Sequence, residues 1–265
     1  MQTLDIYEIE AFGAGLPFKG NPAAVVPLTA FPADAMLQAV AEANNLAETA
    51  FFVPNGKEGH FKLRWFTPAV EVPLCGHATL ASAFVIMTIL QPHLPAVTFD
   101  SQSGLLAVTR SGNVLTLDFP ALGRDAIDIP EAVVAALGAR PQEAYRSGQF
   151  LLLVYATAAD VAGLAPDFKA LGLAVDFGVI VTAPGDEGVD FVSRFFGPAV
   201  GIDEDPVTGS AHCSLTPYWA ARLGRKRLEA RQISARGGFL TVEDHGARVG
   251  ISGLCRLYLE GRIHI

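Results

Sequence analysis

The chain has 265 residues, of which 51% are hydrophobic and 17% are charged, and its formal net charge is −8. This length allows two compact cores of roughly 100–150 residues each, and the acidic balance argues against a nucleic-acid-binding protein, which needs a basic surface. The longest apolar run, at 80–90, is shorter than the roughly 20 residues of a membrane span. Because the N-terminus also lacks the pattern of a signal peptide, we expect a cytoplasmic protein.

The first half alternates strand and helix patterns. Asparagines at 44 and 45 suit a helix end, which places residues 45–49 on a short connection, and a helix that is apolar on nearly every side must be buried. In chain order we expect a strand at 4–12, a loop at 15–22, a strand at 23–28, a helix at about 33–44, strands at 50–54 and 61–66, a buried helix at 76–90, and a hairpin around the turn at 110–113.

The second half follows the same plan. Mostly antiparallel strands wrapped round one apolar helix in each half is the simplest α+β architecture that buries both helices. The expected elements are a helix at 130–138, with proline in its first turn and glycine at its end, strands at 149–157 and 178–184, a helix at 209–224, and a hairpin around 244–246.

The second half also repeats segments of the first half in the same order. FKLRWFTPAV at 61–70 reappears 130 residues later as FVSRFFGPAV. PLCGHA at 73–78 corresponds to PVTGSA at 206–211, and GLLAVTRSG at 104–112 corresponds to GFLTVEDHG at 238–246. A period near half the chain length indicates two copies of one domain, related by a pseudo-twofold axis. We therefore predict domains at 1–118 and 119–265, joined near 119–125, with a ligand held between them.

Each copy has a Pro-x-x-Gly turn directly before its buried helix, at Gly76 and at Gly209. The first N–H groups of a helix have no partner within the helix, and the helix dipole adds partial positive charge there. Such an end attracts carboxylate or phosphate, so the predicted ligand is a small anionic metabolite. The alternative is that the two glycines only allow the chain to turn into the helix.

The informative positions are those where the copies differ. A racemase with two bases needs proton-transfer groups on opposite faces of one carbon, and here the thiol of Cys75 has no thiol partner. The inserted stretch 201–205 adds Asp205 to the second loop, so Glu48, His77 and Asp205 form a one-base arrangement. The paired positions that bear on chemistry are Cys75/Thr208, His77/Ser210 and Glu48/Gly178.

Each of these residues also has a structural interpretation. Glu48 could be a solvated surface residue, His77 a capping histidine and Asp205 a turn or N-cap residue. Cys75 could be a small buried side chain. The cysteines at 75, 213 and 255 lack metal-type spacing, so we predict neither a disulfide framework nor a metal site.

Four ordered motifs closely resemble the PhzF-like (phenazine biosynthesis-like) family and, more distantly, the diaminopimelate epimerase and proline racemase superfamily. The resemblance covers essentially the whole chain. It implies the epimerase-like fold, with two similar domains that each wrap a strand barrel around a central helix, and a homodimer. The motifs are GNPAAVV at 20–26, NLAETAFF at 45–52, LRWFTPAVEVPLCGHATLA at 63–81 and GIDEDPVTGSAH at 201–212.

The resemblance also implies roles for single residues. Glu48 falls where the family has its catalytic acid/base, and His77 and Asp205 fall where it has active-site polar residues. The substrate-binding residues that we predict are Asn21, Cys75, Gly76, Gly209 and Ser210. PVTGSA stands where the epimerases and racemases have a second cysteine, which puts stereoinversion by two thiols in doubt.

These observations predict a cofactor-independent isomerase that moves a proton within a small carboxylate-bearing substrate. In the best-known relative the substrate is a dihydro-hydroxyanthranilate, a cyclic amino acid, and no metal or organic cofactor takes part. Two alternatives stay open. One is a racemase or epimerase that uses Cys75 with a non-thiol partner, and the other is a non-catalytic protein that binds small carboxylates.

Overall fold

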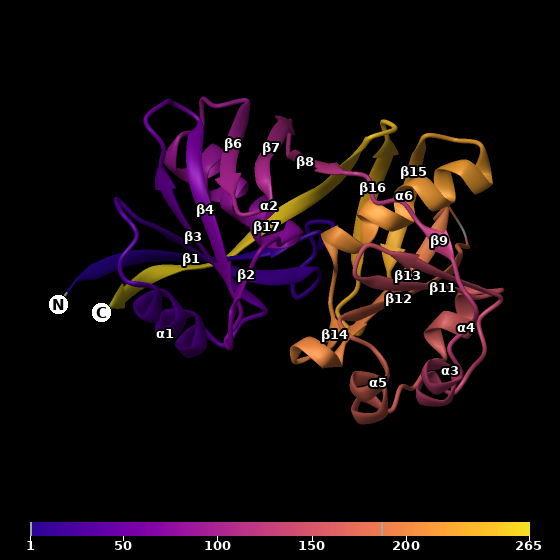
Figure 1. Ribbon diagram of the computed structural model, residues 1–265. Coiled ribbons are helices and arrows are strands. Elements are labelled where there is room, and N and C mark those ends of the chain that lie inside the picture. The colour runs from indigo at the N-terminus through magenta and orange to yellow at the C-terminus, as the bar shows by residue number, and fades with distance from the viewer. Residues whose placement is uncertain (1, 187) are drawn as a thin grey trace. The chain divides into compact units, whose positions relative to one another are not determined.

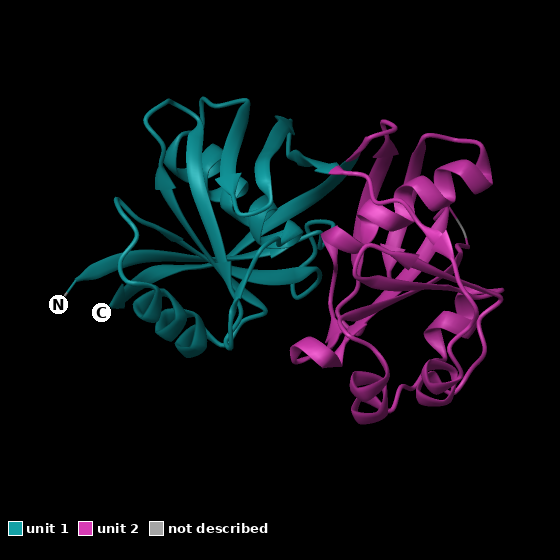
Figure 2. Ribbon diagram, in the orientation of Figure 1, with its two compact units in different colours: residues 1–119, 250–265 teal, residues 120–249 magenta. Residues whose placement is uncertain are grey.

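The computed structural model describes residues 2–186 and 188–265. The chain divides into two compact units, of which unit 1 contains residues 1–119 and 250–265 and unit 2 contains residues 120–249 (Figure 2). The C-terminal segment thus lies in unit 1, whereas the plain repeat would put it in unit 2. The physical reason is that the last strand, β17 (Arg248–His264), pairs antiparallel with the first strand, β1 (Thr3–Ala11).

The strands of unit 1 close into a ring. β2–β3 and β4–β6 pair in parallel, while β1–β2, β3–β4, β6–β7 and β7–β8 are antiparallel, and β8 also pairs with β17. A closed ring leaves no long unpaired edge. Besides β1 and β17 its strands are β2 (Asn21–Pro27), β3 (Glu48–Pro54), β4 (His60–Phe66), β6 (Ala96–Ser101), β7 (Gly104–Ser111) and β8 (Val114–Pro120), with the short β5 (Glu71–Val72) beside β4.

A buried helix runs through unit 1, as the apolar stretch predicts. Helix α2 (Gly76–Phe84) packs against β1, β2 and β3 and continues as a π-helix (Val85–Leu90) (Figure 1). Helix α1 (Asp34–Asn44) covers a second apolar cluster, and Asn45 ends it in the left-handed conformation at φ 50°, as the asparagine pair predicts. These two helices confirm the predicted spans within one residue.

Unit 2 repeats the plan with additional helices. Helix α6 (Gly209–Leu223) packs against β15 and β16, while α3, α4 and α5 border a separate apolar cluster (Figure 1). The elements are β9 (Asp125–Ala126), α3 (Glu131–Leu137), β10 (Glu143–Ser147), β11 (Phe150–Val154), α4 (Ala158–Ala162), α5 (Phe168–Ala174), β12 (Gly178–Pro184), β13 (Phe191–Gly197), a 3-10 turn (Pro198–Val200), β14 (Ile202–Asp205), α6, β15 (Arg227–Gln232) and β16 (Gly238–Asp244).

Strand registers confirm the internal repeat. Thr49 pairs with Phe66 between β3 and β4, and Val179 pairs with Phe196 between β12 and β13, the same offset that the sequence motifs have. The registers make Gly178 the counterpart of Glu48. Glu48 is the first residue of β3 and not part of a connection, which corrects the predicted strand start by two residues. Among the described residues, no helix is both long and apolar enough to cross a membrane.

Candidate active site

Glu48 and His77 meet at the start of the buried helix in unit 1. His77 is the second residue of α2, and its Nε2 lies 3.0 Å from Oε2 of Glu48. Both residues are buried, with 8% and 3% of their surfaces exposed. Their position rules out a solvated Glu48, and it makes His77 a partner of a carboxylate instead of a helix cap. The arrangement places an acid/base pair beside the free N–H groups of a helix end.

Two further side chains reach the other nitrogen of the same imidazole. Nδ1 of His77 lies 3.2 Å from the amide Nδ2 of Asn21 and 3.5 Å from Sγ of Cys75. Asn21 opens β2, and Cys75 is the residue that precedes α2, so three elements converge on one ring. The imidazole therefore has a carboxylate on one nitrogen and an amide and a thiol on the other.

Burial and charge set the protonation of this cluster. Burial by itself lowers the pKa of His77, but Cys75 and Glu48 overcome it and raise that pKa well above its ordinary value of 6.5. For Cys75 burial and the Glu48 carboxylate act together and raise the pKa to about 11. The thiol is consequently protonated at neutral pH, because the thiolate would stand in a dry site next to a negative charge.

Glu48, Cys75 and His77 also form a group of possible metal ligands. One ligand atom of each lies within 4.8 Å of the others, and thiolate, imidazole and carboxylate are ligands that Zn²⁺ accepts. However, Cys75 faces Nδ1 of the ring and Glu48 faces Nε2. A single ion bound to all three would require one of these side chains to move, so the absence of a metal stays a prediction.

The second loop carries a different network, within unit 2. The Thr208 hydroxyl donates to Oδ2 of Asp205, and the fully buried Gln232 joins both ends of the turn. Its amide nitrogen donates to the Asp205 carbonyl, and its oxygen accepts from the Thr208 N–H, both at 2.8 Å. Gly209 and Ser210 begin α6 directly after this turn. The network holds the turn in one shape.

The space that corresponds to the Glu48 side chain is filled in unit 2. A Cβ atom added to Gly178 would lie 2.4 Å from the ring of Phe195. The ring thus covers the strand start at which unit 1 presents a carboxylate. Because Ser210 stands in the place of His77, unit 2 repeats the helix start without its acid/base pair.

The predicted site residues fall into two groups. Asn21, Glu48, Cys75, Gly76 and His77 come together in unit 1, and Asp205, Gly209 and Ser210 come together in unit 2. Gln232 is not among the predicted residues. Its signal was present, since Gln232 follows Leu228 and Ala230 on the inward face of a strand, and a polar residue on that face needs buried partners.

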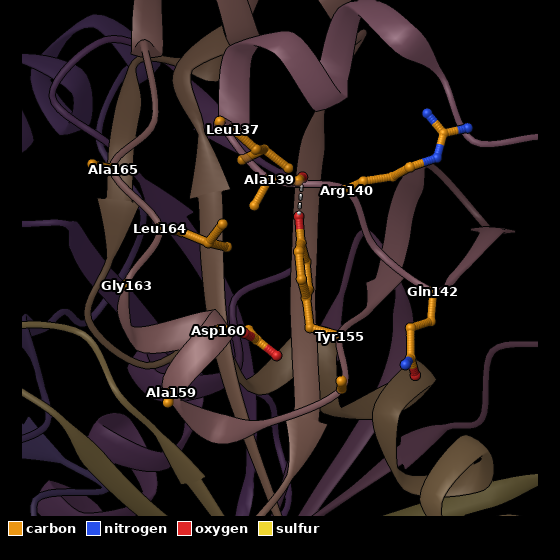
Figure 3. Close-up of a pocket in the computed structure, with 12 residues that line it drawn as sticks. Leu137, Ala139, Arg140, Gln142, Tyr155, Ala159, Asp160, Gly163, Leu164 and Ala165 are labelled. Atoms are coloured by element: carbon orange, nitrogen blue, oxygen red, sulfur yellow. Dashed lines mark hydrogen bonds between the residues drawn. The ribbon is translucent and has the colours of Figure 1, made fainter.

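A separate open hollow of about 570 Å³ lies in unit 2, and three of the polar side chains that line it are already paired (Figure 3). The Tyr155 hydroxyl donates to the carbonyl of Ala139 at 3.2 Å, Arg140 binds Glu131, and Asp160 pairs with the N-cap of α4. Figure 3 shows the guanidinium of Arg140 directed away from Tyr155. The hollow therefore offers no converging polar groups of the kind that a specific ligand site needs.

Comparison with known proteins places these residues in a family context. The family described as phenazine biosynthesis-like protein matches residues 9–261. An uncharacterized isomerase of Pseudomonas aeruginosa is 50% identical over 262 residues, which cover 99% of each chain. The crystal structure of a PhzF family phenazine biosynthesis protein of Enterococcus faecalis superposes with a TM-score of 0.94 at 47% identity and covers 100% of both chains.

A more distant comparison concerns the fold alone. A probable proline racemase of Agrobacterium radiobacter superposes with a TM-score of 0.65 at 11% identity, over 99% of this chain and 92% of that one. The epimerase-like architecture expected from the motifs is thereby confirmed.

Proposed function

The chain belongs to the phenazine biosynthesis-like family, and we propose that it is a cofactor-independent isomerase in which Glu48 moves a proton within a small carboxylate-bearing substrate. That it is an enzyme of the isomerase class follows from relatives that carry this name along their whole length. The observation that supports the chemistry is the buried contact between Glu48 and His77 at the start of α2. No equivalent pair exists among the described residues at the start of α6, so one base serves the reaction.

The geometry suggests a role for each group. The Glu48 carboxylate accepts a proton from a carbon of the substrate and returns it to another carbon, while His77 orients and polarises the carboxylate. The N–H groups around Gly76 favour an anionic group of the ligand. Asp205 remains a predicted catalytic residue that positions and polarises the ligand, and Gly209 and Ser210 remain predicted substrate contacts. A small cyclic amino acid as the substrate and a homodimeric state are further parts of the proposal.

The racemase alternative is less well supported. Burial and Glu48 raise the pKa of Cys75 to about 11, so the thiol is a poor base at neutral pH. Its counterpart is Thr208, which has no useful acidity. A one-base transfer needs neither group to ionise.

The test is hydrogen exchange with solvent. The protein is incubated in D₂O with a panel of cyclic amino acids, hydroxy acids and other small carboxylates, and deuterium incorporation is followed by mass spectrometry. Since general acid/base catalysis contributes about 10²–10⁴-fold, we expect E48Q to lose exchange by that factor while ligand affinity is kept. The control is E131Q, because Glu131 is an exposed carboxylate outside the site.

The possible outcomes separate the three hypotheses. Exchange in E48Q at the unaltered rate removes Glu48 from the mechanism. Exchange with inversion that is lost in C75A supports the racemase. Saturable binding of a ligand with no exchange at any of its carbons supports a non-catalytic binding protein.

A further inference from the structure

Asn21 is completely buried beside His77, and backbone packing fixes its position. Gly20 has φ +78°, and a Cβ there would lie 2.2 Å from the carbonyl oxygen of Ala11. Strand β2 therefore begins tightly against the end of β1. From this fixed start the amide nitrogen of Asn21 reaches within 3.2 Å of Nδ1 of His77.

The chemistry of the amide decides the form of the ring. An NH₂ group can only donate, so Nδ1 must accept with its lone pair. The hydrogen of the neutral ring then sits on Nε2, which lies 3.0 Å from Oε2 of Glu48. An imidazolium carries a hydrogen on both nitrogens, and its Nδ1–H would face the hydrogens of the Asn21 amide. The observed contact is compatible with the neutral ring.

The other neighbours of the ring act in the opposite direction. Glu48 on β3 and Cys75 before α2 are the groups that raise the pKa of His77 against the effect of burial. Asn21, on β2, is neutral, and its amide nitrogen is placed where a second ring proton would have to go. Its amide is therefore a donor that opposes double protonation.

The repeat shows that the fold does not need this amide. Counting back two residues from the parallel registers of β2–β3 and β11–β12, aligned on Glu48 and Gly178, brings Asn21 opposite Gly148, in the turn before β11. Unit 2 thus lacks the amide, the imidazole and the carboxylate together. Asn21 accompanies the acid/base pair and not the strand architecture.

We propose that Asn21 is a positioning residue whose amide nitrogen donates to Nδ1 of His77 and so opposes the second ring proton that the Glu48 carboxylate favours. The inference rests on the proposed roles of Glu48 and His77. A second proton on the ring would stabilise the carboxylate form of Glu48 and weaken it as a base. Once the ring has lost this second proton, Glu48 is able to accept a proton from carbon.

The first experiment needs no variant. In protein labelled with ¹⁵N, an N–H···N hydrogen bond gives a scalar coupling between the two nitrogens, and His77 is assigned by comparison with H77Q. Above the titration midpoint of His77 we expect a coupling between Asn21 Nδ2 and His77 Nδ1, an unprotonated Nδ1 and a protonated Nε2. A protonated Nδ1 without this coupling in that pH range overturns the proposal.

The second experiment reads the sign of the effect. Removing a donor that opposes protonation should raise the titration midpoint of His77 by about half to one pH unit in N21L. N21D should raise it further, because a carboxylate favours the imidazolium. A lower midpoint in N21L would mean that the amide presents its oxygen, and an unchanged midpoint would mean that Asn21 only fills space. Either result contradicts the proposal.

Controls separate this idea from loss of folding and from failure of the proposed function. N55L removes an exposed amide that binds Asp100 and should leave the midpoint unaltered. Should N21L not fold, N21G replaces it, since unit 2 has glycine at this position. The acid limb of kcat/KM for exchange should shift with the NMR midpoint. If E48Q disproves the proposed catalysis, the nitrogen coupling still decides the role of Asn21.

Discussion

Both units brace the loop before their central helix in the same way. Arg64 in unit 1 and Arg194 in unit 2 each bind a glutamate through two nitrogens, at 2.7 Å for Glu71 and at 2.7 and 3.0 Å for Glu204. Each guanidinium also lies over a phenylalanine ring, at 5.1 and 4.8 Å from its centre. A serine in the connection between two strands completes the brace, because the Ser103 and Ser234 hydroxyls donate to the carbonyls of Pro73 and Pro206 at 2.7 Å.

The buried histidines of the two helices differ sharply. His77 meets a carboxylate, and its pKa is raised. His212 in α6 meets the Thr208 carbonyl, to which its Nδ1 donates at 2.8 Å, and burial lowers its pKa to about 4 despite that bond. Thr79 occupies the equivalent position in α2 and donates to the Cys75 carbonyl. The shared frame thus places its buried histidine against a carboxylate in unit 1 and against a backbone carbonyl in unit 2.

The largest stability difference should appear between the two arginines. Arg194 is the more buried, with 11% of its side chain exposed against 21% for Arg64, and it also donates to the carbonyls of Val161 and Leu164. Breaking a buried ion pair by removing one partner costs about 3–5 kcal/mol. We expect R194M to lower the free energy of unfolding by about 3 kcal/mol and R64M by about half as much, measured by urea unfolding. Equal losses would contradict this ranking of the two arginines.

The next prediction concerns acid stability and His212. Its pKa is about 4 in the folded state and 6.5 in the reference state, so between these values the unfolded chain binds more protons and stability falls as the pH falls. At pH 4 the loss is roughly 3 kcal/mol. H212T copies Thr79, keeps a donor for the Thr208 carbonyl and should remove that part of the pH dependence.

Urea unfolding between pH 4 and 7 tests this prediction. A cavity left by threonine would lower the free energy of unfolding at every pH, whereas protonation of the histidine changes only the slope of that free energy against pH. H245T, at an exposed histidine, is the control. His77 contributes with the opposite sign, since a raised pKa gives stability that is present below 6.5 and lost as the pH rises through the folded-state pKa. An acid slope that is the same in H212T and the parent protein contradicts the assignment.

The shared fold of the two units, and the positions at which they differ, can be predicted because the internal repeat is recognisable in the amino-acid sequence. Gly178 stands opposite Glu48 at a fixed offset, and the registers of β3 and β12 confirm it. Two features of the structure cannot be recognised in this way. A strand pattern gives a period and not a partner, so the return of β17 to β1 was missed. Which nitrogen of His77 faces which neighbour depends on how β2, β3 and α2 converge.

The smallest expected effect tests why unit 2 has no carboxylate at the position that corresponds to Glu48. The Phe195 ring lies against Gly178, and a methyl group there would come within 2.4 Å of it. Overpacking of this kind typically costs about 1–3 kcal/mol, so we expect G178A to lower the free energy of unfolding by about 2 kcal/mol. G123A is the matched control, because a Cβ at Gly123 meets nothing within 4 Å. In the F195L background, G178A should lower the free energy of unfolding by less than it does in the parent protein, since the smaller side chain leaves room for the methyl group. If G178A is as stable as G123A, the ring does not hold that space, and the absence of a carboxylate in unit 2 needs another cause.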